Sequence, residues 1–352
     1  MRIIMCTTKY DWYNCRPYFC AYNKFITVIK AGGVVLMSQK IVAGDLTTRG
    51  RHPRNYKKYI PMYLFLVLPV LQVIIFNYLP MYGITIAFKD FKMRRGILGS
   101  SWVGLKHFEK LFNDPTFLRV LFNTLRLSLL SLVICFPATI LYALMMNEVH
   151  SMRFKRLSQT ISYLPHFLSW IIVGNFAYQI LSPSNGIVNA ILVRLGILKE
   201  PVYFLIKKEA FDTIFIIAEL WKELGWGIVI YLAAIAGIDM SLYEAAQIDG
   251  AGRFQQALHV TIPCILPTIS TLLILRLGTL MDVGFDPIFN LYNEGTYEVA
   301  DVISTYVYRR GVIDSKYDYT TALGLFQNVV SLLLVLGGNW LSRKADPDFK
   351  IL

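Results

Sequence analysis

Six long apolar stretches constrain the fold of this chain more than any other feature of its sequence. They cover residues 59–82, 121–146, 157–181, 211–237, 262–281 and 321–341. A helix needs about 20 mostly apolar residues to cross a bilayer, and each stretch is that long. Proline and glycine inside several of them are frequent in helices of membrane bundles. The sequence therefore predicts an all-α polytopic membrane protein with six transmembrane helices and both termini on the same side.

Composition agrees with this class and excludes two others. The chain is 55% hydrophobic and only 16% charged, whereas its formal net charge is +12. Soluble domains carry about a quarter charged residues, so a cytosolic enzyme is excluded. Nucleic-acid binding needs basic clusters on a polar domain, and here the cations are spread beside the apolar stretches. The positive charge therefore predicts contact with the lipid bilayer rather than with a nucleic acid.

The distribution of lysine and arginine predicts the orientation. Dense cation clusters lie in residues 49–58, before the first stretch, and in residues 153–156, between the second and third. Such clusters favour the cytoplasm when they lie in short loops or close to a span. Residues 89–119 also hold seven Lys or Arg, but this loop is longer and therefore counts less in predicting the orientation. We predict a multi-pass protein of the bacterial cell membrane with cytoplasmic N- and C-termini.

The segment between the fourth and fifth stretches predicts a projecting helix, turn and helix. Ser241 is a candidate N-cap for a first helix that carries Glu244. Gly250 is suited to end this helix, because glycine takes positive φ at low cost. A second short amphipathic helix is expected over 253–260, and Pro263 then opens the fifth span. An ordinary helical loop between two spans is the alternative interpretation.

The same segment resembles the EAA loop of permease subunits in binding-protein-dependent ATP-binding-cassette importers. The matching positions are Glu244, Ala245, Ala246, Gly250, Val260, Ile262 and Pro263. The resemblance implies the type I importer permease (MetI-like) fold, with residues 240–262 as a cytoplasmic coupling helix that lies in a cleft of an ATPase subunit. The residues expected to couple transport to ATP hydrolysis are Glu244, Ala245, Ala246, Asp249, Gly250 and Arg253.

Further segments look like the polysaccharide or lipo-oligosaccharide permeases of the carbohydrate-uptake class. They are residues 78–83 with 87–91, 96–100 with 102–105, 162–170, 182–189 and 301–308. This resemblance implies import of oligosaccharides, with acidic, polysaccharide-derived ones among the candidates. The implied partners are a second homologous permease subunit, two ATPase subunits and an extracellular or periplasmic solute-binding protein.

The chain itself is expected to be a transport subunit and not an enzyme. It contains no Gly-x-x-x-x-Gly-Lys-Ser/Thr loop that would hold nucleotide phosphates, so ATP and Mg²⁺ are expected on the partner ATPases and no cofactor on this chain. Its histidines lack a second ligand at metal spacing, and we predict no metal site. A secondary transporter and an intramembrane enzyme are the alternatives, but neither an internal repeat nor a catalytic pair is evident.

Polar residues inside the spans are candidates for the substrate path, because they are costly there. Glu219, Lys222, Glu223 and Trp226 have spacings of three, four and seven, which put them on one face of a helix. One interpretation is that this face binds a sugar, the charged groups through hydrogen bonds to its hydroxyls and Trp226 through an apolar ring surface. The other is a structural ion pair of Lys222 with a neighbouring carboxylate. Arg276 in the fifth span is expected either to pair across the bundle with Glu219 or Glu223, or to bind an acidic sugar.

The sequence divides into three parts on this basis. Residues 1–58 form an N-terminal cytoplasmic extension, of which 1–36 lie before a second candidate start at Met37. Residues 59–342 form the six-span permease domain with the coupling loop 240–262, and residues 343–352 a cytoplasmic tail.

Overall fold

The computed structural model describes residues 59–345 of the chain. The chain divides into two units, residues 1–67 and 68–352. Within the first unit, the described residues begin helix α1 (Ile60–Val73), which ends in the second unit. The second unit contains all the other described elements. The predicted extension 1–58 and residues 346–352 of the predicted tail lie outside the described residues.

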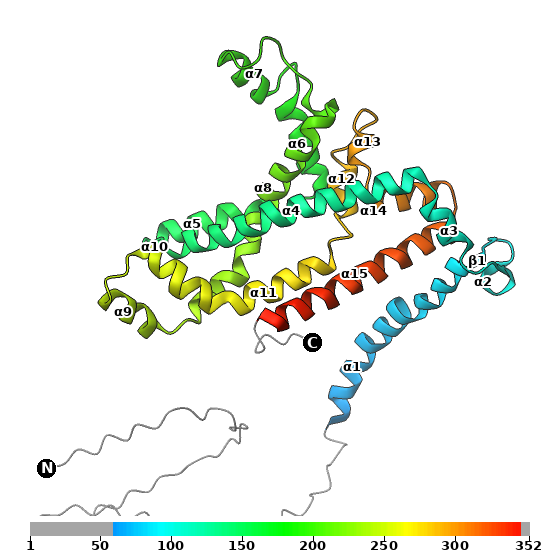
Figure 1. The fold of residues 1–352 in the computed structure, drawn as a ribbon, viewed down its shortest axis with the longest axis horizontal. Coiled ribbons are helices and arrows are strands. Elements are labelled where there is room, and N and C mark those ends of the chain that lie inside the picture. Colours follow the sequence, from blue (N-terminus) through cyan, green and yellow to red (C-terminus); the bar gives the residue numbers. More distant parts are fainter. Residues whose placement is uncertain (1–58, 346–352) are drawn as a thin grey trace, which may run out of the picture. The chain divides into compact units, whose positions relative to one another are not determined.

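Almost all of the regular structure in the described part is helical (Figure 1). After α1 the elements are η2 (Ile74–Tyr78), η3 (Leu79–Phe88), β1 (Lys89–Asp90), α2 (Gly96–Gly99), β2 (Ser101–Trp102), α3 (Lys106–Phe112), α4 (Pro115–Asn147), α5 (Met152–Tyr163), η4 (Leu164–Phe167), α6 (Trp170–Leu181), α7 (Ile187–Arg194), η5 (Phe204–Ile206), α8 (Lys208–Ala236), α9 (Met240–Ile248), α10 (Arg253–Gln256), η6 (Ala257–Thr261), α11 (Ile262–Gly278), α12 (Phe285–Phe289), α13 (Tyr297–Ala300), α14 (Ile303–Val307), η7 (Tyr308–Ile313) and α15 (Tyr317–Ala345). Strands β1 and β2 form a two-residue antiparallel pair in which Lys89 lies opposite Trp102.

Most of the predicted spans correspond to long apolar helices. In the described part, four continuous helical segments are long and apolar enough to cross a membrane: Ile60–Phe88, Pro115–Asn147, Arg253–Gly278 and Tyr317–Ser342. A fifth is α8, which qualifies together with α9 across a bend of 74°. In the same order, these segments match the first, second, fifth, sixth and fourth predicted spans, with ends that differ by up to nine residues.

The third predicted span, expected as one helix over 157–181, is interrupted. Helix α5 gives way to the short 3₁₀ turn η4, and α6 begins only at Trp170. Two local features explain the break. Pro165 has no N–H group to continue the α-helical bonding. Ser169 is extended, with ψ of 152°, and its Oγ accepts a hydrogen bond from the N–H of Ile172 at 3.4 Å, so it caps α6.

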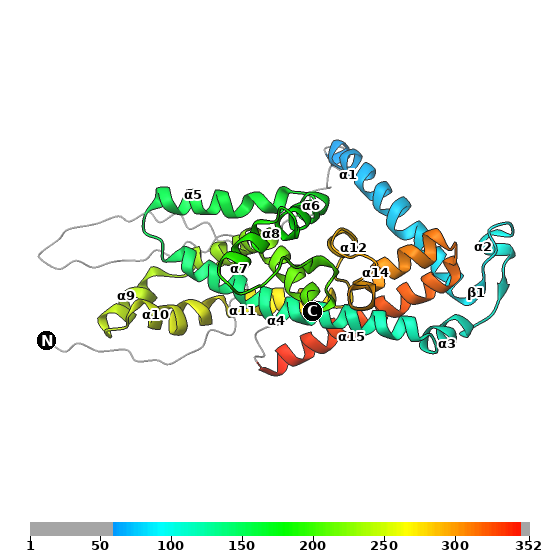
Figure 2. The same cartoon turned by 90° about the horizontal axis from the view of Figure 1, so that it is seen from above.

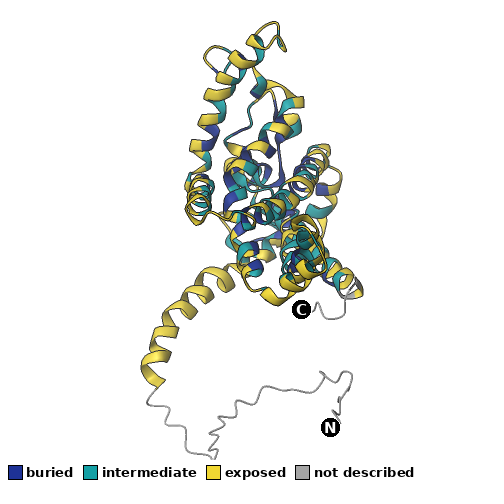
Figure 3. Ribbon diagram, turned by 90° about the vertical axis from the view of Figure 1, so that its left-hand side faces the viewer, coloured by how far each residue is buried: buried dark blue, intermediate teal, exposed yellow. Residues whose placement is uncertain are grey.

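Helices α4 and α8 pack against each other and form the centre of the unit, with α5 against α8 and α11 against α15 (Figure 2). The apolar core is built mainly from their facing side chains, including Leu127 on α4 and Phe215 and Ile228 on α8. Long stretches of the helices are exposed (Figure 3). Their exposed side chains are largely apolar: Val133 on α4 and Leu333 on α15, for example, are both more than half exposed. Large exposed apolar faces of this kind suit lipid or another membrane subunit.

Helix α5 comes very close to α8 at Gly225. A Cβ atom built on this residue would lie 2.0 Å from the carbonyl oxygen of Ser162. We therefore expect Gly225→Ala to force the two helices apart and to cost about 1–3 kcal/mol of stability, the usual range for overpacking. The measurement is the melting temperature and yield of the detergent-solubilised protein. Gly324→Ala on α15 is the matched control, because nothing lies within 4 Å of its added Cβ and alanine favours helix. Equal stability of the two variants would contradict the close contact.

Candidate functional site

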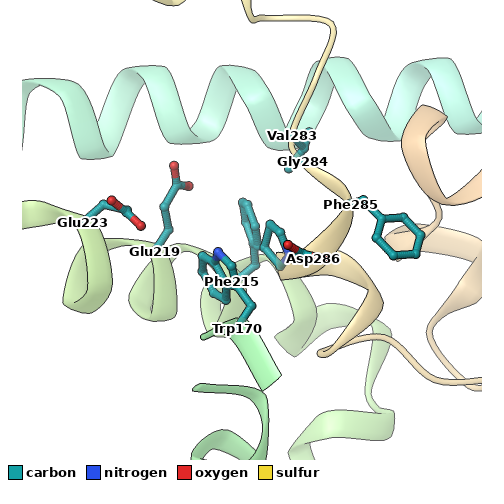
Figure 4. Close-up of a pocket in the computed structure, with 9 residues that line it drawn as sticks. Trp170, Phe215, Glu219, Glu223, Val283, Gly284, Phe285 and Asp286 are labelled. Atoms are coloured by element: carbon teal, nitrogen blue, oxygen red, sulfur yellow. The ribbon is translucent and has the colours of Figure 1, made fainter. Parts of the chain in front are cut away.

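A pocket of about 320 Å³ lies where the interrupted third span meets α8 (Figure 4). Carboxylates and aromatic rings dominate its wall, which is formed by Trp170, Phe215, Glu219, Glu223, Val283, Gly284, Phe285, Asp286 and Pro287. Trp170 is present because the break at η4 starts α6 at this level. Two of the four residues that the sequence placed on the α8 face, Glu219 and Glu223, thus line a single cavity.

Glu219 is held by a three-way contact with α4 and α11. Its Oε1 accepts hydrogen bonds from Ser131 Oγ at 2.7 Å and from Arg276 Nη2 at 2.8 Å, and Arg276 Nη2 also donates to Ser131 Oγ at 2.7 Å. The Glu219 side chain is 14% exposed, whereas that of Arg276 is 45% exposed. Of the two pairings that the sequence left open for Arg276, the structure has the one with Glu219.

The other oxygen of Glu219 is unsatisfied. Its Oε2 is buried, and no described residue donates a hydrogen bond to it. A buried acceptor without a donor costs about 1–3 kcal/mol.

Lys222 and Glu223 form a second cluster with the backbone of the break. Lys222 is 5% exposed and donates to the carbonyl oxygen of His166 at 2.7 Å. Its Nζ also lies 3.1 Å from Glu223 Oε1 and 5.7 Å from the centre of the Trp170 ring. The ion pair that the sequence left open therefore joins Lys222 to Glu223. The buried ammonium ties α8 to the interrupted span, since it satisfies a carbonyl group there.

His166 is a member of this site that the sequence prediction missed. Its Nδ1 lies 2.7 Å from Glu223 Oε2, and its ring stacks on Trp226 with centres 4.7 Å apart and planes within 2°. The predicted sugar-stacking face of Trp226 thus has one side occupied by His166. The sequence signal was present, because a histidine inside an apolar span is itself a candidate functional group.

The structure therefore divides the predicted substrate-path residues into two groups. Glu219 and Glu223 line the pocket, whereas Lys222, Trp226 and Arg276 are not among its lining residues and contact the lining residues or their neighbours. The other lining residues are Trp170, Phe215 and residues 283–287, the last of which span the loop before α12 and the first turn of α12. Their contribution to one pocket depends on tertiary packing, which the sequence does not show.

The segment after α8 forms the predicted projecting helix, α9, with a different cap. Asp239, and not Ser241, is the N-cap residue, since its Oδ1 accepts a hydrogen bond from the N–H of Ser241 at 3.0 Å. Aspartate is as good a cap as serine, and this one comes two residues earlier. That hydrogen bond holds the pKa of the Asp239 carboxyl below its usual value.

Gly250 ends α9 as predicted, in a Schellman motif. Its φ is +79°. Its N–H donates to the carbonyl oxygen of Gln247 at 3.0 Å, and the N–H of Ala251 donates to the carbonyl oxygen of Ala246 at 2.9 Å. The remaining predicted coupling residues, Glu244, Ala245, Asp249 and Arg253, are all exposed. The exposed apolar side chains Met240, Ile248 and Phe254 lie in the same segment, which suits contact with another protein.

The second predicted helix, 253–260, is not a separate element. Helix α10, the π-helical turn η6 and α11 form one continuous helical segment from Arg253 to Gly278. Proline at position 263 would clash with a regular α-helical carbonyl four residues earlier. The wider π-helical turn immediately before α11 accommodates it, so the fifth span extends directly into the projecting segment.

The fold and this site define a polytopic helical membrane protein with a polar and aromatic cavity, and comparisons with known proteins identify its class. Residues 135–348 match the family model described as "Binding-protein-dependent transport system inner membrane component". The chain belongs to this family. Its fold, predicted as the MetI-like permease fold of ATP-binding-cassette importers, is confirmed, and it is a transport subunit and not an enzyme.

Among relatives, the chain is 44% identical over 292 residues to the polygalacturonan/rhamnogalacturonan transport system permease protein YteP of Bacillus subtilis, covering 83% of this chain and 90% of the relative. It is 41% identical over 287 residues to protein LplB of the same organism, covering 82% and 90%.

Two solved structures resemble the chain, each with a TM-score of 0.76 and 45% identity. One is a bacterial ABC transporter involved in the import of the acidic polysaccharide alginate, covering 83% of this chain and 98% of the matched chain. The other is a bacterial alginate ABC transporter in complex with an alginate pentasaccharide-bound periplasmic protein, covering 84% and 98%.

Proposed function

We propose that this chain is one of two related permease subunits of an ATP-driven importer that moves oligosaccharides from an extracellular solute-binding protein into the cytoplasm by alternating access. Relatives whose names refer to polygalacturonan and alginate support polysaccharide-derived sugars as the substrate class. ATP and Mg²⁺ bind to two partner ATPase subunits, and nucleotide-driven closure of these subunits rocks the spans.

The combination of carboxylates and aromatic rings in one pocket wall is the observation that carries the saccharide proposal. A sugar presents many hydroxyl donors and an apolar ring face. The pocket offers the carboxylates of Glu219, Glu223 and Asp286 as acceptors and the rings of Trp170 and Phe285 as apolar surfaces. Such a combination of a few polar groups with aromatic walls is typical of small-molecule sites.

Arg276 supports acidic sugars within this class. Its Nη2 contacts both Glu219 and Ser131, and nearly half of its side chain is exposed. A guanidinium group has further N–H donors arranged to bind a carboxylate in a bidentate pair. A uronate carboxylate approaching Arg276 would compete with Glu219 for it, and this exchange would open the contact between α8 and α11.

Helix α9 is the proposed coupling helix, in contact with an ATPase subunit. Glu244, Ala245, Ala246, Asp249, Gly250 and Arg253 form or adjoin its exposed surface. The segment lies near the C-terminal end of α4, because Arg253 Nη2 donates to His150 Nε2 at 3.3 Å. With α9 in the cytoplasm, the opposite end of α4, its N-terminus, lies at the outer membrane surface. In a six-span topology, both chain termini are then cytoplasmic.

Uptake by the complete importer in proteoliposomes tests the substrate class. We expect ATP-dependent uptake of oligogalacturonate, and slower uptake of its methyl ester, which has the same rings and hydroxyls but no charge. Equal uptake of the two would refute the preference for acidic sugars. Absence of uptake with either, together with uptake of a non-saccharide solute, would refute the saccharide proposal.

His166 is expected to orient Glu223 for the sugar. His166→Phe keeps a ring against Trp226 but removes the hydrogen bond to Glu223, and we expect the maximal uptake rate to fall about tenfold, the upper range for one net hydrogen bond. The half-saturating concentration should stay the same, because the solute-binding protein sets it. Phe167→Leu is the control, as Phe167 is exposed next to His166. An unchanged rate for His166→Phe would contradict this role.

A further inference from the structure

Helix α9 has few attachments to the rest of the described chain. None of its residues is buried, and it packs mainly against η6. Short turns connect it to α8 and to α10. The hydroxyl group of Tyr243 adds a specific side-chain contact, because its Oη lies 2.9 Å from Thr261 Oγ1.

The direction of this hydrogen bond follows from the second partner of Thr261. Thr261 is 3% exposed, and its Oγ1 also lies 3.4 Å from the carbonyl oxygen of Gln256, to which only the threonine can donate. Tyr243 therefore donates to Thr261. The amide of Gln256 in turn donates to the carbonyl oxygen of Ala251 at 2.8 Å, which fixes the turn after Gly250 to the same point.

Thr261 is the last residue before α11, so this contact joins α9 to the start of a long helix. The rise of 1.5 Å per residue puts Arg276 about 22 Å further along that helix. There Arg276 bonds to Glu219, which lines the pocket. The continuous helical segment Arg253–Gly278 thus carries the Tyr243–Thr261 contact near one end and the contact of Arg276 with the pocket-lining Glu219 near the other.

We propose that Tyr243 is a positioning residue that transmits the movement of α9 to α11 through its hydrogen bond to Thr261. The inference rests on the proposed function, in which α9 contacts an ATPase subunit. A second side-chain link from this segment, Arg253 to His150, joins two exposed residues at 3.3 Å and is therefore weaker. The bond to the buried Thr261 has less competition from water, so it constrains the position of α9 more strongly.

Two shape-conserving variants remove this bond. In the complete importer in proteoliposomes with its solute-binding protein, we expect Tyr243→Phe and Thr261→Val each to raise the number of ATP molecules hydrolysed per sugar imported by about 2- to 10-fold, the range that one net hydrogen bond supports. The double variant should be no worse than either single variant, because both remove the same interaction. Thr261→Ser keeps the hydroxyl group, so this single variant should hydrolyse the same number of ATP molecules per sugar as the wild type.

Thr271→Val is the matched control on the same helix, since within residues 59–345 Thr271 Oγ1 bonds only to the carbonyl oxygen of Pro267 one turn earlier. It should leave the ratio unchanged. Additive effects of Tyr243→Phe and Thr261→Val, or failure of Thr261→Ser to restore coupling, would overturn the inference. If Gly250→Val uncouples the importer and Tyr243→Phe does not, only this inference fails. If neither does, the proposed coupling role of α9 fails with it.

Discussion

Gly250→Val is expected to abolish sugar uptake while ATP hydrolysis by the assembled complex continues. Gly250 has φ of +79°, and an L-residue pays roughly 1–2 kcal/mol there, with a β-branched residue such as valine worse still. The turn must then rearrange, and both Schellman hydrogen bonds are lost. Helix α9 would then no longer end at the point where the proposed function has it meet the ATPase. We expect uptake in proteoliposomes to fall at least 10-fold.

The matched control for this variant is two residues away. Gly252 has φ of −68°, which any residue adopts, and it precedes α10 as its N-cap, where serine is favoured. Gly252→Ser should therefore transport at the normal rate. If Gly250→Val transported as fast as Gly252→Ser, the conformation of this turn would have no role in coupling.

Arg276→Met is expected to have the second-largest effect, a loss of most uptake. The substitution leaves the largely buried carboxylate of Glu219 with Ser131 as its one remaining partner among the described residues. Removing one member of a buried ion pair costs about 3–5 kcal/mol, and the exposure of Arg276 reduces this figure to about 1–3 kcal/mol. Both the melting temperature of the protein and its uptake rate should therefore decrease.

A double variant separates the structural role of Arg276 from a role in substrate binding. Arg276→Met with Glu219→Gln removes both charges, so the melting temperature should recover. If Arg276 also binds the sugar carboxylate, uptake of oligogalacturonate by the double variant should stay below that of Glu219→Gln alone, even though the protein is stable again. Recovery of both properties would make the Arg276–Glu219 pair purely structural.

Local sequence signals predicted the helices and the turn of α9 well. Apolar length defines a membrane helix almost independently of its neighbours. Gly250 was recognisable because the conformation it adopts is costly for other residues. The choice of Asp239 over Ser241 as the cap was missed, since both residues are good caps and only the helix start distinguishes them.

The candidate site was predictable only in part, because it depends on contacts between distant segments. Helical spacing identified Glu219 and Glu223, but it could not show that Arg276 pairs with Glu219 and Lys222 with Glu223. His166 was not recognisable as a partner of Glu223, because the two residues lie 57 positions apart in the sequence. The break in the third span follows from the local effects of Pro165 and Ser169, but the contacts of His166 and Trp170 with α8 that it permits are tertiary.

ATP-dependent uptake of a labelled oligosaccharide tests the central claim most directly. The complete importer is reconstituted in proteoliposomes, with ATP on the side of the ATPase subunits and the solute-binding protein on the other. The account predicts accumulation of oligogalacturonate that requires both ATP and the binding protein and is lost in Gly250→Val. Uptake that is independent of ATP or of the binding protein would contradict it.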